Sequence, residues 1–308
     1  MKSLLILQKA LVALAIAFLV ALPGAANALS IMDPFNIPSA MDEGAVQLGK
    51  GVAYGAEHRQ KLDIYAPTVP SGSAPVVVFI YGGGWDHGDR RDYAFAGRAL
   101  SAKGFVTVIP DYRLVPEVRY PGFIEDCAAA VAWVEEHISE YGGDPQRVFI
   151  MGHSAGAYNA VMLGLDRSFL RQAGAQIPVR GIVGLSGPYD FYPFEFAEVT
   201  NAFGTADNPQ ATQPINLARP DSPPMFLATG TFDPIVKPRN TTVLAEALSQ
   251  AGATVTTKYY KGLEHMEPVL ALGKTLRWRA PVLDDVVEFF TRLGAFDPQA
   301  IGAVQLIK

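Results

Sequence analysis

The sequence predicts an α/β fold in which a mostly parallel central sheet is covered by helices on both faces. Runs of apolar, β-branched residues, such as VVVFIY at 76–81, indicate strands that are buried on both faces. Amphipathic helical stretches separate these runs, and parallel neighbouring strands need such crossover connections. With 308 residues and a hydrophobic fraction of 49%, the chain can bury a sizeable core.

The elements follow one another in a regular order. Residues 29–45 show little periodicity and predict an irregular N-terminal segment. The stretch 61–67 alternates as a half-exposed strand does, and residues 70–75 predict a turn. Further strands are expected at 76–81, from 105, and at 147–152, 179–187, 224–230 and 254–260. Helices are expected at 92–104, 122–141, 154–165, 241–252 and 281–294.

One segment, residues 188–223, departs from this alternation because it is aromatic, weakly periodic and rich in proline. An insertion at the end of a strand can form a small lid or a pocket wall, and it can equally be an ordinary helix and loop. An apolar substrate pocket and plain core packing are both open for the aromatic residues of this region and of the glycine-rich stretch. These residues are Trp85, Tyr189, Phe191, Tyr192 and Phe194.

The first 28 residues have the composition of a secretion signal. Lys2 and Lys9 precede an apolar stretch at 10–22, and Ala26-Asn27-Ala28 has the small-x-small pattern that signal peptidases accept. The stretch is shorter than the roughly 20 residues of a spanning helix, which disfavours the alternative of an uncleaved anchor. We therefore expect a signal peptide at 1–28, a single domain at 29–308 without stable membrane insertion, and a periplasmic or secreted protein.

Charge and cysteine content narrow the partners. The formal net charge is −5 and no run of like charges occurs, so neither nucleic acid nor an anionic membrane surface is an expected partner. A small neutral or weakly polar ligand fits better. Cys127 is the only cysteine and cannot form a disulfide within the chain. Its apolar helical surroundings predict a buried packing residue rather than a nucleophile.

The segment FIMGHSAGAYNAV places Gly152-His153-Ser154-Ala155-Gly156 between an expected strand and an expected helix. This is the G-x-S-x-G pattern of a nucleophile elbow, in which glycines leave room for a strained turn that lifts the serine hydroxyl above the sheet. The pentapeptide alone is weak evidence, since an ordinary turn can have it. Its strand-turn-helix setting predicts that Ser154 is a nucleophile.

A serine hydroxyl needs a base, and the base needs a carboxylate that orients it. His265 follows the last expected strand and is the best candidate base among five histidines. Asp233 follows the strand at 224–230, and the order Ser154, Asp233, His265 is that of the α/β-hydrolase arrangement. The alternative acids are Asp190 and Asp207, and the disfavoured histidines are His58, His87, His137 and His153, the last of which we expect to point away from Ser154.

The stretch YGGGW, residues 81–85, places three glycines directly after a buried strand. Attack by Ser154 creates an oxyanion that needs backbone N–H donors, and glycine permits both close approach and unusual dihedrals. We therefore expect the donors to be Gly83, Gly84 and Ala155, the residue after the nucleophile.

These motifs resemble those of the hormone-sensitive-lipase-like and feruloyl-esterase-like (BD-FAE) carboxylesterases over residues 50–293. The resemblance rests on YGGGW, DYRLVPE, GHSAG, FDPIV and EHM in the expected order. It implies an α/β-hydrolase fold and hydrolysis of a small-molecule carboxylic ester through an acyl-enzyme, with no metal or organic cofactor. The family usually has histidine where this chain has Tyr81, a residue that braces the glycine loop. A formamide hydrolase of the kynurenine-formamidase type and an inactive binding protein are the alternatives.

Overall fold

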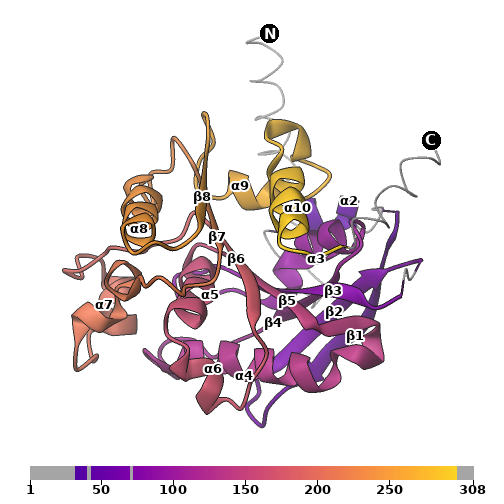
Figure 1. The fold of residues 1–308 in the computed structure, drawn as a ribbon, viewed down its shortest axis with the longest axis horizontal. Helices are drawn as coiled ribbons and strands as arrows, with labels where there is room; N and C mark the ends of the chain where they lie inside the picture. The colour runs from indigo at the N-terminus through magenta and orange to yellow at the C-terminus, as the bar shows by residue number, and fades with distance from the viewer. Residues whose placement is uncertain (1–31, 40–42, 70–71, 297–308) are drawn as a thin grey trace, which may run out of the picture.

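The computed structural model describes residues 32–39, 43–69 and 72–296, and within them eight strands form one sheet (Figure 1). The strand order is β1-β2-β4-β3-β5-β6-β7-β8. β2 is antiparallel to both of its neighbours, and all pairings from β4 to β8 are parallel. The strands are β1 (Ala45–Ala53), β2 (Lys61–Pro67), β3 (Ala74–Ile80), β4 (Val106–Pro110), β5 (Gly143–His153), β6 (Val179–Leu185), β7 (Met225–Gly230) and β8 (Val255–Tyr260). The predicted, mostly parallel α/β sheet is confirmed.

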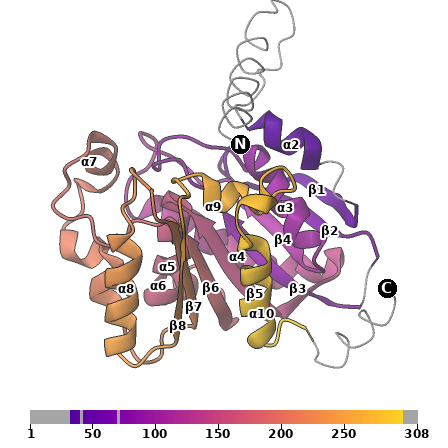
Figure 2. The same cartoon turned by 90° about the horizontal axis from the view of Figure 1, so that it is seen from above.

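Helices lie on both faces of this sheet. α3 and α10 lie on one face and α4 and α5 on the other, while α7 and α8 lie at the end of the molecule away from β1 (Figures 1 and 2). The helices are α2 (Asp33–Ser39), α3 (Ala94–Ser101), α4 (Gly122–His137), α5 (Ala155–Leu165), α6 (Ser168–Gln172), α7 (Ala197–Phe203), α8 (Arg239–Gln250), α9 (Glu267–Leu270) and α10 (Val282–Arg292). Each predicted helix therefore forms within a few residues of its expected bounds.

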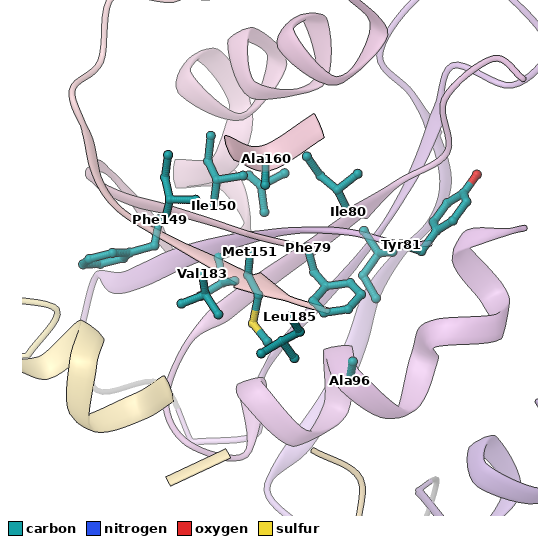
Figure 3. Packing of buried hydrophobic residues seen from close by; sticks show 14 of the residues in the cluster. Phe79, Ile80, Tyr81, Ala96, Phe149, Ile150, Met151, Ala160, Val183 and Leu185 are labelled. Carbon is teal, nitrogen blue, oxygen red and sulfur yellow. The ribbon is translucent and has the colours of Figure 1, made fainter. Parts of the chain in front are cut away.

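The core lies between the sheet and these two helical layers. Successive side chains of a strand point to opposite faces, so Ile80 of β3 points toward Ala160 of α5 while Phe79 points toward Ala96 of α3 (Figure 3). All seven residues of β3 are buried. The continuous apolar runs of the sequence thus correspond to strands that are covered on both faces.

Two expectations near the N-terminus are wrong. Part of the segment expected to be irregular forms α2, which is held by tertiary contacts: Phe35 packs on Phe95 with ring centroids 6.5 Å apart. The strand at 61–67 is not half-exposed, because Leu62 through Ala66 are all buried. β1, which the sequence pattern did not reveal, covers its outer edge, and α3 approaches closely where a Cβ on Gly97 would lie 2.5 Å from the Tyr65 ring.

The secretion signal expected at residues 1–28 lies outside the described residues. Among the residues that the structure describes, no helix has both the length and the hydrophobicity required to span a bilayer.

Candidate active site

Ser154 lies in the sharp turn between β5 and α5. Its φ of 53° and ψ of −123° are unusual for a residue with a side chain, and such strain concentrates at functional sites. The turn needs the flanking glycines: a Cβ on Gly152 would lie 2.2 Å from the carbonyl oxygen of Gly156, and one on Gly156 would lie 2.1 Å from that of Ile80. The sequence therefore builds the strand-turn-helix elbow that the motif predicts.

Three side chains from separate loops meet at this turn. His265 Nε2 lies 2.9 Å from Ser154 Oγ, and His265 Nδ1 lies 2.8 Å from Asp233 Oδ2. Asp233 and His265 are only 4% and 6% exposed. The other carboxylate oxygen of Asp233 accepts hydrogen bonds from two backbone N–H groups, of Ile235 at 3.0 Å and Val236 at 2.9 Å.

This geometry fixes the proton positions that the chemistry needs. The Asp233 carboxylate is acceptor-only when ionised, so Nδ1 of His265 carries a proton and donates a hydrogen bond to the carboxylate. Nε2 then accepts the hydroxyl proton of Ser154. Of the other candidate acids, Asp190 pairs with Arg239 at 2.6 Å and Asp207 is exposed.

The glycine loop lies directly beside the nucleophile. A Cβ on Gly82 would lie 2.9 Å from Ser154 Cβ. Gly83 has a φ of 138° and Gly84 a φ of 55°. The carbonyl of Gly83 accepts from the backbone N–H groups of Asp86 and His87 at 3.1 and 3.0 Å. Within the described part of the chain, the N–H groups of Gly83 and Gly84 have no acceptor, so both are available to a ligand.

Ala155 is the first residue of α5. The N–H groups of a first helical turn have no intrahelical acceptor, and the helix dipole is positive there. The expected donors Gly83, Gly84 and Ala155 therefore belong to two elements that both border Ser154. This arrangement can bind a developing oxyanion.

Comparison with known proteins places the chain in a family. A sequence model of the BD-FAE family matches residues 62–248, more than half of the chain. The chain belongs to the BD-FAE family. The matched range contains the glycine loop, the elbow and Asp233, whereas His265 follows it.

Relatives of this BD-FAE chain include named esterases. A probable isoprenylcysteine alpha-carbonyl methylesterase of Oryza sativa subsp. japonica is 29% identical over 270 residues, which cover 78% of this chain and 62% of the relative. The carboxylesterase NlhH of Mycobacterium tuberculosis is 32% identical over 219 residues, which cover 62% of this chain and 66% of the relative. The chain spans between 51% and 62% of the length of the plant relatives that it matches.

Solved structures show the same fold. Esterase B of Lactobacillus Rhamnosis, inhibited by a tributyrin phosphonate, superposes with a TM-score of 0.73 at 20% identity, covering 85% of this chain and 91% of that one. A truncated carbohydrate esterase from gut microbiota superposes with a TM-score of 0.71 at 20% identity, covering 82% and 98%. The BD-FAE chain therefore has the α/β-hydrolase fold.

His153 lies closer to His265 than the sequence indicates. Its Nε2 donates to the backbone carbonyl of His265 at 3.2 Å, and the two rings are 5.1 Å apart. Its Nδ1 lies 3.5 Å from the hydroxyl of Tyr93. Burial lowers the pKa of His153 to about 3, so the ring is neutral and is no competing base. In the sequence, only the position of His153 directly before Ser154 indicates that it lies beside the site.

In the described part of the chain, the side chains of the other three histidines make no hydrogen bond with Ser154 or Asp233. His58 and His87 are exposed, and His137 stacks on Trp133 with ring centroids 4.6 Å apart. Cys127 is fully buried as expected, and burial raises the pKa of its thiol.

The aromatic residues proposed for a substrate pocket divide between core and surface. Tyr189 is fully buried, because its ring fills the space beside Gly184 and Gly187, so it packs in the core instead of lining a pocket. Trp85 is only 3% exposed, and its Nε1 donates to Asn159. Phe191 is half-buried.

The segment 188–223 combines α7 with two short 3-10 helices, Pro209–Thr212 and Pro214–Leu217. Phe203 of α7 packs on Trp85 with centroids 4.8 Å apart, and Phe191 lies 6.2 Å from Trp85. Tyr192 and Phe196 are exposed. The segment is thus an aromatic wall packed against Trp85, directly after the three glycines.

Proposed function

We propose that this BD-FAE protein is a serine carboxylesterase that hydrolyses small or medium carboxylic esters through an acyl-enzyme. The carrying observation is the hydrogen-bonded chain from Ser154 through His265 to Asp233, with contacts of 2.9 and 2.8 Å, at a strained elbow. A serine with a base and an oriented carboxylate is the arrangement that activates a hydroxyl for acyl transfer.

Acylation follows from this geometry. Ser154 Oγ attacks the ester carbonyl carbon while His265 Nε2 takes the hydroxyl proton. The carbonyl oxygen becomes an oxyanion, which accepts hydrogen bonds from the N–H groups of Gly83, Gly84 and Ala155. Collapse of this intermediate breaks the ester C–O bond, and the leaving alkoxide takes the proton from His265. The alcohol leaves, and the acyl group remains bound to Ser154 Oγ as an ester.

Deacylation uses the same groups with water as the nucleophile. His265 removes a proton from water, and the resulting hydroxide adds to the acyl carbon. The second oxyanion occupies the same donors. Breakage of the acyl bond releases the carboxylic acid, and Ser154 Oγ recovers its proton from His265. The cycle converts one ester and one water into one carboxylic acid and one alcohol, and it returns Ser154 and His265 to their initial protonation states.

The names of the relatives support this proposal. They include methylesterases, two mycobacterial esterases and a carboxylesterase. Tributyrin is itself a short-chain ester, and its phosphonate inhibits the Lactobacillus enzyme of similar fold.

Turnover of p-nitrophenyl esters of graded chain length tests the proposal. We expect hydrolysis of the acetate and butyrate by wild type and loss of it in Ser154→Ala. Ser186→Ala is a matched control. Like Ser154, Ser186 directly follows a strand and has a positive φ, of 51°. Its Oγ, however, has no hydrogen-bond partner in the described structure. Hydrolysis of an N-formyl amide alone would identify a formamide hydrolase, and no turnover would indicate a binding protein.

Export is part of the same proposal. The lysine-flanked apolar stretch and the Ala26-Asn27-Ala28 site support cleavage after Ala28 and a periplasmic or secreted enzyme. Mass spectrometry of protein exported from a bacterial host should show a chain that begins at Leu29. Recovery of the chain with its first 28 residues in the membrane fraction would contradict export as a cleaved protein.

A further inference from the structure

Arg59 connects three segments: the residues after β3, the residues after β4 and the far end of the glycine loop. It lies just before β2, and its side chain is 20% exposed. Its Nε donates to the Tyr112 carbonyl at 2.8 Å, and its Nη2 donates to the Tyr81 hydroxyl at 2.7 Å and to the Gly88 carbonyl at 2.8 Å. The carboxylate of Asp111 lies 3.8 Å away. The guanidinium thus holds three neutral acceptors in fixed positions.

Tyr81 presents its hydroxyl to Arg59 from a rigid position. The ring is fully buried and lies between Tyr112 and Tyr93, with centroids 4.8 and 5.7 Å away. Its hydroxyl points away from the other labelled core side chains (Figure 3). Burial raises the pKa of Tyr81 well above its ordinary value, so the hydroxyl is neutral and accepts from Arg59.

The glycine loop has two limbs, residues 82–83 and residues 87–88, and the two lie in close contact. A Cβ on Gly83 would lie 2.1 Å from the carbonyl oxygen of His87, and one on Gly88 would lie 2.7 Å from that of Gly82. The Tyr81 ring would be 2.8 Å from the same added atom on Gly88. Because the limbs have no free space between them, the position of His87 and Gly88 determines the position of Gly82 and Gly83. Arg59 fixes the position of His87 and Gly88 through its hydrogen bond to the Gly88 carbonyl.

We propose that Arg59 is a positioning residue of the oxyanion site, acting through Gly88 and the hydroxyl of Tyr81. It does not contact substrate; it keeps the N–H groups of Gly83 and Gly84 aligned with the oxyanion. The inference rests on the proposed esterase function, since these donors matter only if an oxyanion forms at Ser154. The hydrogen bond between Arg59 and Tyr81 braces the loop at the residue that directly precedes its three glycines.

Kinetics of Arg59→Met test this role, because methionine keeps an unbranched stem and has no donor. We expect kcat for p-nitrophenyl butyrate to fall about tenfold with KM nearly unchanged, less than the 10²–10³ that outright loss of an oxyanion donor costs. Arg59→Lys should fall between wild type and Arg59→Met, since one ammonium cannot reproduce a planar fork of donors. Titration of the active serine with a phosphonate corrects each kcat for the competent fraction.

Arg113→Met is the matched control. Arg113 is 23% exposed and makes a multiple contact with the buried carboxylate of Asp126, yet it has no contact with Gly88 or Tyr81. Its corrected kcat should stay close to wild type even if its melting temperature falls. An equal fall of kcat in both variants would mean that the loss of any partly buried arginine has this effect, and would overturn the positioning role.

A double-mutant cycle with Tyr81→Phe separates positioning from general packing. Phenylalanine keeps the stacked ring and removes the acceptor, so the kcat loss of Tyr81→Phe should shrink in the Arg59→Met background. If Arg59→Met does not fold, Tyr81→Phe and Arg59→Lys provide the same comparison. If the wild type is active and these variants keep its kcat, or differ from it only by a higher KM, the inference is overturned while the proposed function stands. A wild type that neither hydrolyses esters nor reacts with the phosphonate would overturn the proposed function and the inference together.

Discussion

Replacing Gly83 with alanine places a methyl group in the most crowded part of the glycine loop. The added Cβ would lie 2.1 Å from the carbonyl oxygen of His87. The φ of Gly83, 138°, is one that residues with side chains rarely adopt. Both the steric conflict and the backbone conformation force the loop to move. The N–H of Gly83 must move with it.

Gly84→Ala is the matched comparison within the same loop. Its φ of 55° lies in the left-handed region, and the nearest atom to an added Cβ is 3.5 Å away. An L-residue in that region costs about 1–2 kcal/mol, so the substitution lowers stability without displacing the loop. The two variants therefore make the same chemical change with different effects on the donor positions.

We expect kcat of Gly83→Ala to fall by about 10²–10³, the loss found when an oxyanion donor is removed from a protease. Gly84→Ala should keep kcat within several-fold of wild type. The loss in Gly83→Ala should appear in kcat rather than KM, because the donor's interaction strengthens as the oxyanion forms. Steady-state kinetics with p-nitrophenyl butyrate, corrected by active-serine titration, measure both. Nearly normal turnover by Gly83→Ala would refute the assignment of this loop to the oxyanion.

Three further variants test other parts of the structure. Asp233→Asn should lower kcat by up to about 10⁴-fold with little change in melting temperature, because the amide favours the wrong tautomer of His265; a normal kcat would contradict the role of Asp233. His153→Gln should lessen acid sensitivity: the folded-state pKa near 3 lies below the unfolded value near 6.5, so the unfolded state binds a proton first and wild type loses stability as pH falls through that window. The loss should reach about 2 kcal/mol at pH 5 and be absent from the variant in urea titrations, and parallel curves for the two proteins would contradict it. Gly97→Ala should lower the free energy of unfolding by about 1–3 kcal/mol, because the methyl group overpacks against Tyr65, and should leave KM unchanged.

The parts of the molecule that the sequence predicts are those with short-range signals. Buried strands appear as continuous β-branched runs, and the elbow requires glycines at fixed spacing. The end of a parallel strand places the following residue at a known edge of the sheet, which is why the sequence alone pairs Asp233 and His265 with Ser154.

The parts that the sequence did not reveal depend on contacts between distant residues. β1 contains Gly49 and Gly51, which obscure a strand pattern, and it forms by pairing with β2. Asp63 in β2 suggested exposure, but it is buried because Arg90 pairs with it at 2.8 Å. Tyr189 looked equally suited to a pocket and to the core, and no local pattern separates the two. Arg59 lies in a turn with no motif, so its contact with Tyr81 became visible only in the folded structure.

The most direct measurement of the central claim is the covalent reaction of Ser154 with an alkyl p-nitrophenyl phosphonate. Intact-protein and peptide mass spectrometry would follow the adduct in wild type, Ser154→Ala, His265→Ala and the control Ser186→Ala. An activated Ser154 predicts one adduct on the peptide that contains it, formed in wild type and Ser186→Ala, much slower in His265→Ala and absent in Ser154→Ala. An adduct on another residue, or ester hydrolysis that persists in Ser154→Ala, would contradict the account.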